Sequence, residues 1–134
     1  MAITFTPITL EEMDKFLKRG FRSLKPTKNL GRIEIYYDLT VMDDTKIGIR
    51  VWTSIASGRD TGAGVGDDAI RVQLYHFGRN KPLKAGKAPI VKRTQNWRDS
   101  LTDRIEDYLE AISDHEEALR AGAVINWAGE QVTK

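Results

Sequence analysis

GRIEIYYDLTVMDDTKIGIRVWTSI, residues 31–55, is the stretch that decides the fold of this chain. Apolar and polar residues alternate in both of its halves, which is typical of strands with one buried and one exposed face. The Asp43–Asp44 pair between the halves favours a turn, so the two strands are predicted to form an antiparallel hairpin. The positions expected to be buried are Ile33, Ile35, Tyr37, Leu39, Val41, Ile47, Ile49, Val51, Thr53 and Ile55.

The same alternation continues beyond the hairpin. AIRVQLYHF, residues 69–77, predicts a third strand with Ile70, Val72 and Leu74 facing the core. A shorter fourth strand is predicted over residues 88–93, after the loop GRNKPLKAGK. We therefore expect an antiparallel sheet of about four strands within residues 31–93.

Helical spacing of apolar residues brackets this sheet. Residues 1–20 are predicted to contain a short helix that ends at Gly20, and residues 21–31 read as a turn-rich connection. Residues 96–121 are predicted to form one long helix whose apolar stripe covers a face of the sheet, and residues 122–134 form a tail. The fold class that follows is α+β, a single domain over residues 1–134, with elements in the order α-β-β-β-β-α.

The composition excludes several classes of protein. The chain has 134 residues, 40% of them hydrophobic and 30% charged, which favours one folded domain over a disordered chain. It contains no cysteine, so disulfides, thiol catalysis and zinc ribbons are excluded. Because no signal peptide and no long apolar run are visible, we expect a cytoplasmic protein that does not span a membrane.

The charges are distributed unevenly along the chain. Residues 15–98 carry 18 Lys and Arg against 7 Asp and Glu, whereas residues 99–134 carry 3 against 9. A basic body suggests a polyanionic partner, and the acidic face of the long helix is a candidate surface for a protein partner. The alternative is that the basic and acidic segments neutralise each other within the fold.

The glycine-rich stretch GRDTGAGVGDDA, residues 58–69, resembles a phosphate-binding loop only in composition. No helix is predicted after it and no Gly-Lys-Ser/Thr closes it, so neither a dinucleotide fingerprint nor a Walker A loop is present. Asp60, Asp67 and Asp68 could hold a hard cation but lack the spacing of a calcium loop. We interpret the stretch as a long connection between strands and expect no metal and no cofactor.

Catalytic constellations are scarce. His76 falls on the buried side of its strand, where a core role is expected, and His115 has no nucleophile motif near it. Glu34 and Asp38 share the exposed strand face, and ion pairing with Arg50 or Arg71 is their expected role. The chain is therefore interpreted as a non-enzyme, with a metal-dependent nuclease as the remaining catalytic alternative.

The exposed strand face gives the functional hypothesis. Cations beside large aromatics on a flat sheet suit single-stranded nucleic acid, because phosphates pair with the cations and bases stack on the rings. The candidate binding residues are Arg32, Tyr36, Arg50, Trp52, Arg59, Arg71, Gln73, Tyr75, Arg79, Lys81, Lys84, Lys87, Lys92 and Arg93. Single-stranded DNA is the expected ligand, and a homo-oligomer is the expected assembly.

The element order over roughly residues 31–115 resembles that of sheet-based single-strand binders, namely the Whirly and coactivator-type folds and the cores of strand-annealing proteins. The run VWTSI, GVGDDAIRV and NWRDSL is similar to small phage and bacterial proteins. The resemblance is architectural and implies no particular residues. The alternative function is a protein-interaction or inhibitor module, of the kind phages encode as accessory proteins, which would use the same face as an interface.

Overall fold

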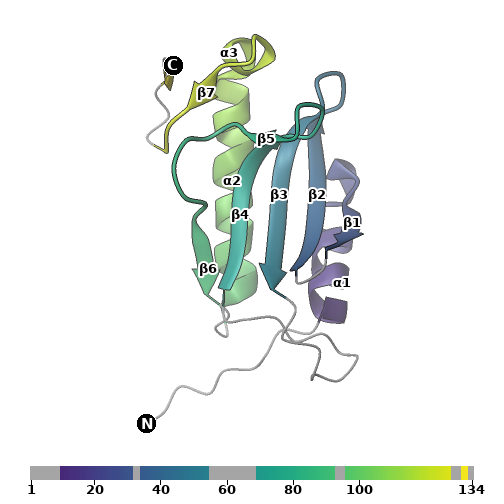
Figure 1. Ribbon diagram of the computed structural model, residues 1–134. Coiled ribbons are helices and arrows are strands. Elements are labelled where there is room, and N and C mark those ends of the chain that lie inside the picture. Colours follow the sequence, from purple (N-terminus) through teal and green to yellow (C-terminus); the bar gives the residue numbers. More distant parts are fainter. Residues whose placement is uncertain (1–9, 32–33, 55–68, 93–95, 128–130, 133–134) are drawn as a thin grey trace.

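The computed structural model describes residues 10–31, 34–54, 69–92, 96–127 and 131–132. It is an α+β structure, as predicted, with an antiparallel sheet followed by a long helix (Figure 1). The elements are α1 (Leu10–Gly20), the 3-10 helix η1 (Arg22–Leu24), β1 (Thr27–Leu30), β2 (Glu34–Met42), β3 (Ile47–Ser54), β4 (Ala69–His76), β5 (Lys81–Pro82), β6 (Ile90–Lys92), α2 (Trp97–Asp114), α3 (Glu116–Arg120), β7 (Val124–Ile125) and β8 (Gln131–Val132).

The main sheet has the strand order β1-β2-β3-β4-β5, and β6 also pairs with β4. Every pair is antiparallel. The predicted hairpin is β2 and β3, in which Tyr37 lies opposite Val51. The register shifts between Thr40 and Met42, and this bulge turns Met42 inward while Val41, predicted to be buried, is only half-buried.

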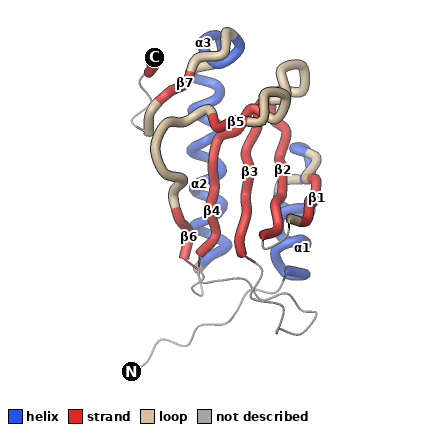
Figure 2. Tube along the Cα trace, in the orientation of Figure 1, coloured by secondary structure: helices blue, strands red, loops and turns tan. Residues whose placement is uncertain are grey.

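Both long helices cover the same face of this sheet (Figure 2). The alternating residues of β2, β3 and β4 pack there against Met13 and Leu17 of α1 and against the apolar stripe of α2. Phe16 meets Trp97 edge to face at 5.2 Å, which joins the two helices. The Tyr108 hydroxyl donates a hydrogen bond of 3.0 Å to the Val72 carbonyl, which fixes α2 to β4. The core therefore lies between the helices and one side of the sheet.

Four parts of the fold differ from the sequence prediction. The predicted connection over residues 21–31 contains η1 and the edge strand β1, and β5 forms within the predicted loop of residues 78–87. The helix predicted over residues 96–121 is broken at His115, after which α3 begins. The tail forms the small hairpin β7–β8, with Ile125 exchanging backbone hydrogen bonds with Leu83 and Ala85. None of the described helices is long and apolar enough to cross a membrane.

Candidate nucleic-acid interface

The face of the sheet opposite α1 and α2, here called the open face, is not covered by any element among the described residues (Figure 1). Strand register places its side chains in rows across the sheet. One row runs Tyr36, Trp52, Arg71 and Ile90, and the next row runs Asp38, Arg50 and Gln73. Because neighbouring strands are about 4.8 Å apart, four residues in a row span on the order of 15 Å.

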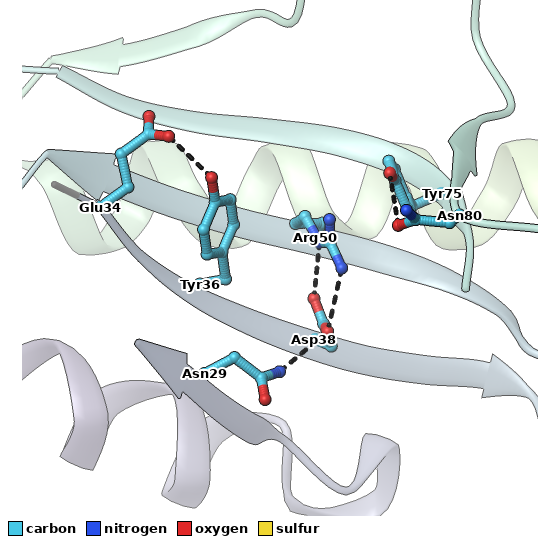
Figure 3. A network of polar contacts seen from close by, with 7 residues as sticks. All are labelled: Asn29, Glu34, Tyr36, Asp38, Arg50, Tyr75 and Asn80. Carbon is cyan, nitrogen blue, oxygen red and sulfur yellow. Dashed lines mark hydrogen bonds and ion pairs between the residues drawn. The ribbon is translucent and has the colours of Figure 1, made fainter. Parts of the chain in front are cut away.

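Arg50 lies at the centre of the open face (Figure 3). Its Nε and Nη2 donate hydrogen bonds of 2.9 and 3.3 Å to the two carboxylate oxygens of Asp38, and Asn29 donates a third to Asp38 at 3.1 Å. The side chains of Arg50 and Asp38 are only 21% and 15% exposed. Burial alone lowers the pKa of Arg50, but the bonds and charge of Asp38 outweigh that effect, so the pKa is raised overall. The predicted pairing of Asp38 with Arg50 is confirmed.

Three aromatic rings lie around Arg50, and a fourth lies beside one of them. Together they form what we call the aromatic band, made of Tyr36, Trp52, Tyr75 and Phe77. The Arg50 guanidinium lies 4.1 Å from the Tyr75 ring centroid, 5.1 Å from that of Tyr36 and 5.6 Å from that of Phe77. Trp52 lies 6.3 Å from Tyr36 at the end of the band. Cation–π contacts of this kind hold the rings in place around a fixed positive charge.

Two hydroxyl contacts fix the two tyrosines of the band. The Tyr36 hydroxyl donates to Glu34 Oε1 at 2.7 Å, and this bond raises the pKa of Tyr36. The Tyr75 hydroxyl bonds Asn80 Oδ1 at 3.1 Å in the turn after β4. Glu34 is thus bonded to a ring of the band, whereas its position beside Arg50 and Arg71 had predicted an ion pair.

Gly48 makes room for the band. A Cβ at this position would overlap the Leu39 carbonyl oxygen and lie 2.9 Å from Phe77 Cε2. The ring of Phe77 therefore lies over β3 where no side chain projects. Phe77 and Ile90, which is 53% exposed beside Arg71, were not among the residues predicted for the site. Both occupy positions that the two-residue alternation of their strands assigns to the exposed face, and this pattern would have identified them.

The structure brings six of the predicted residues together on the open face: Tyr36, Arg50, Trp52, Arg71, Gln73 and Tyr75. Lys92 belongs to β6 opposite Ala69. Arg32, Arg59, Arg93 and the glycine-rich connection of residues 58–68 lie outside the described residues. Lys87 is exposed in the loop before β6.

The remaining predicted cations lie elsewhere. Lys81 of β5 lies opposite His76 of β4 in the strand register. The Arg79 side chain lies against Gly122, beyond the end of β4. His76 is only half-buried, and its Nδ1 accepts a hydrogen bond from the Arg79 backbone at 3.1 Å. Burial and the nearby charges of Arg79 and Lys81 lower the pKa of His76.

Lys84 is 8% exposed, with its amine 5.0 Å from the Trp127 ring and 5.6 Å from that of Tyr108. Burial lowers the pKa of Lys84. It contributes to the packing of the C-terminal hairpin against α2 and is left out of the open face.

The described part of the open face is close to neutral. It carries the guanidiniums of Arg50 and Arg71 and the carboxylates of Glu34 and Asp38. No group of three His, Asp or Glu side chains able to hold a metal ion is found among the described residues. The described part of the face therefore offers aromatic surface and a few positioned charges, and several of the cations predicted for the site lie elsewhere.

Comparison with known proteins yields no match for this chain among family models, curated proteins or solved structures.

Proposed function

We propose that this protein binds single-stranded nucleic acid on the open face, with single-stranded DNA as the expected ligand and without catalysis. The observation that carries the proposal is the aromatic band, four rings on a sheet face that no described element covers, three of them around one guanidinium. Stacking of one base on an aromatic side chain contributes about 1–3 kcal/mol and tolerates any sequence, because every base has a π-face.

Trp52 is the main stacking ring in this proposal. Arg50 lies within 5.6 Å of the other three rings and occupies part of their surface, whereas Trp52 stands at the end of the band. Arg71 lies opposite Trp52 in the same row. A base on Trp52 would bring its phosphate within reach of the Arg71 guanidinium.

Because the described part of the open face is nearly neutral, we expect the affinity for nucleic acid to depend only weakly on salt concentration. Single-strand binding loses affinity with a log–log salt slope of about −0.7 per phosphate contact. Since Asp38 already neutralises Arg50, few phosphates are paired and the slope should be shallow, about −1 to −2. Stacking, and not counterion release, then supplies most of the affinity.

The test is fluorescence anisotropy of a labelled oligothymidylate at low and moderate salt. Trp52→Ala should weaken binding about tenfold or more, and Arg71→Ala should weaken it and flatten the salt slope. Arg22→Ala removes an exposed guanidinium from η1 and is the matched control, with no change expected. Absence of binding at low salt, or equal affinities of Trp52→Ala and Arg22→Ala, would contradict the proposal. A label that stays intact with added Mg²⁺ excludes the nuclease alternative.

The exposed Ile90 beside Arg71 favours a second candidate, a protein-interaction module that uses the same neutral face. This candidate predicts that no oligonucleotide binds at any salt concentration. It also predicts that binding of a hydrophobic dye falls in both Ile90→Ser and Trp52→Ala, because both side chains would belong to one apolar contact surface.

A further inference from the structure

The outer surface of the helix layer, formed by α1 and α2, is electrically divided. The segment of residues 15–28 carries six Lys and Arg and no carboxylate. Four of them, Lys15, Lys18, Arg19 and Arg22, form what we call the basic stripe, and all are exposed. On α1 the stripe lies opposite Met13 and Leu17, so it points away from the sheet.

α2 carries the opposite charge. Asp99, Asp103, Glu106, Glu110 and Asp114, the acidic stripe, follow one another at spacings of three and four residues. Helical rotation places them within an arc of roughly 80°, opposite the buried residues of α2. All five are exposed, and none forms an ion pair with another described residue.

In the part of the chain that the structure describes, the two stripes do not pair with each other, although Lys18 of the basic stripe pairs with Asp14 of α1 at 3.2 Å. One ion pair between described residues of α1 and α2 joins Arg98 to Glu12 at 3.3 Å, and neither residue belongs to a stripe. Two complementary stripes on one surface are a self-complementary arrangement, since a two-fold axis between the helices sets each basic stripe against the partner's acidic stripe. A two-fold axis that paired like stripes would instead oppose equal charges.

We propose that the helix layer is the surface on which two copies of this chain associate as a two-fold dimer. A hollow of about 310 Å³ between the helices, lined by Glu12, Lys15, Phe16, Arg19, Gly20 and Arg98, supplies the half-buried Phe16 ring as an apolar contact within the charged surface. The arrangement leaves the open face of each copy on the outside.

The size of the surface sets the strength of the dimer. An 18-residue helix is about 27 Å long, so a layer two helices wide offers on the order of 500 Å² per copy. That area is at the lower end for specific interfaces, and exposed ion pairs are screened by salt. The dimer should therefore be weak, concentration-dependent and dissociated at high ionic strength.

Sedimentation velocity of the full chain at about 50 and about 500 mM NaCl tests the proposal. The wild type should be dimeric at low salt and monomeric at high salt. Lys15→Glu with Arg19→Glu, and separately Glu106→Lys with Glu110→Lys, should each be monomeric at low salt because like charges then face each other. An equimolar mixture of the two variants should dimerise again, since both contacts of the mixed pair are complementary.

A wild type that is monomeric at low salt, a dimer unaffected by either reversal, or variants that stay monomeric when mixed would each overturn the dimer. Circular dichroism establishes that the variants are folded. Oligothymidylate binding by both variants should equal that of the wild type, because the open face is untouched. Loss of that binding in Lys15→Glu with Arg19→Glu would overturn the inference by assigning the basic stripe to nucleic acid.

Discussion

Arg50 organises the open face because one guanidinium serves both Asp38 and three aromatic rings. A buried charge with its counter-ion removed is costly, whereas a paired one is well tolerated. The pair therefore acts as a support for the aromatic band, and its charge is already balanced before any ligand arrives.

Replacing Asp38 by asparagine should separate these two roles. Asp38→Asn keeps the shape but loses the charge, so the free energy of unfolding in urea should fall by about 1–2 kcal/mol. The released Arg50 charge should also steepen the salt slope of oligonucleotide binding by about 0.7, one additional phosphate contact. Asp43→Asn, at an exposed turn position, is the control and should change neither quantity. Equal effects of the two substitutions would refute this role of Asp38.

A substitution at Gly48 tests how tightly Phe77 of the aromatic band packs on β3. Gly48→Ala would drive a methyl group into the Leu39 carbonyl and toward Phe77, and backbone atoms cannot move aside as a flexible side chain can. We expect a loss of about 2 kcal/mol or more in the free energy of unfolding. Gly20→Ala is the control, because nothing lies within 4 Å of its added Cβ. A Gly48→Ala protein as stable as the wild type would show that the close approach of Phe77 is not constrained.

Among the elements, α2 is attached to the sheet through the Tyr108 hydroxyl and the Val72 carbonyl. Tyr108→Phe should cost about 1 kcal/mol at neutral pH, measured by urea unfolding. Tyr75→Phe, which removes a more exposed hydroxyl bond, should cost less. Burial raises the pKa of Tyr108, so its neutral form is favoured in the folded protein.

Because the pKa of Tyr108 is raised in the folded protein, the free energy of unfolding should depend on pH in the alkaline range. The stability due to neutral Tyr108 is complete below about pH 10, the pKa of an unfolded tyrosine, and is lost as the pH rises above it. Tyr108→Phe should therefore lose less stability between pH 9 and pH 11 than the wild type does. Parallel losses in the two proteins over that range would contradict the assignment.

The strands β2, β3 and β4 and the two long helices were predictable because their apolar periodicity extends over eight or more residues. β1 was missed since its four residues, TKNL, carry no alternation and pair only because β2 presents an unsatisfied edge. β5 and β7 have two residues each, too short for any periodic signal. His115 interrupts the predicted helix without a Pro or Gly to mark the break.

The candidate site was predictable to the same extent. Strand parity identified the residues in β2, β3 and β4, but the positions of cations in loops depend on contacts distant in sequence. Lys84 is buried because the tail folds back and places Trp127 over it, and Lys81 follows the register of β5. Neither contact leaves a local pattern in the chain.

For the molecule as a whole, the charges are distributed differently in space from the basic body that the sequence suggested. Several of the described cations lie on the α1 and η1 side and a row of five carboxylates lies along α2, while the described part of the open face is nearly neutral. In our proposals the two sides take different partners, a second copy on the helix layer and nucleic acid on the open face. We therefore expect substitutions on one side to leave the interaction of the other side unchanged.

Intrinsic fluorescence measured during titration with unlabelled oligothymidylate tests the central claim most directly. Trp97 is buried and Trp127 packs on the far side of the sheet, so Trp52 is the described tryptophan that can stack with a base. We predict quenching in the wild type and in Trp127→Phe, and its loss in Trp52→Phe, which keeps a ring and should retain most of the affinity. Absence of quenching in the wild type, or quenching that persists in Trp52→Phe, would contradict binding at the aromatic band.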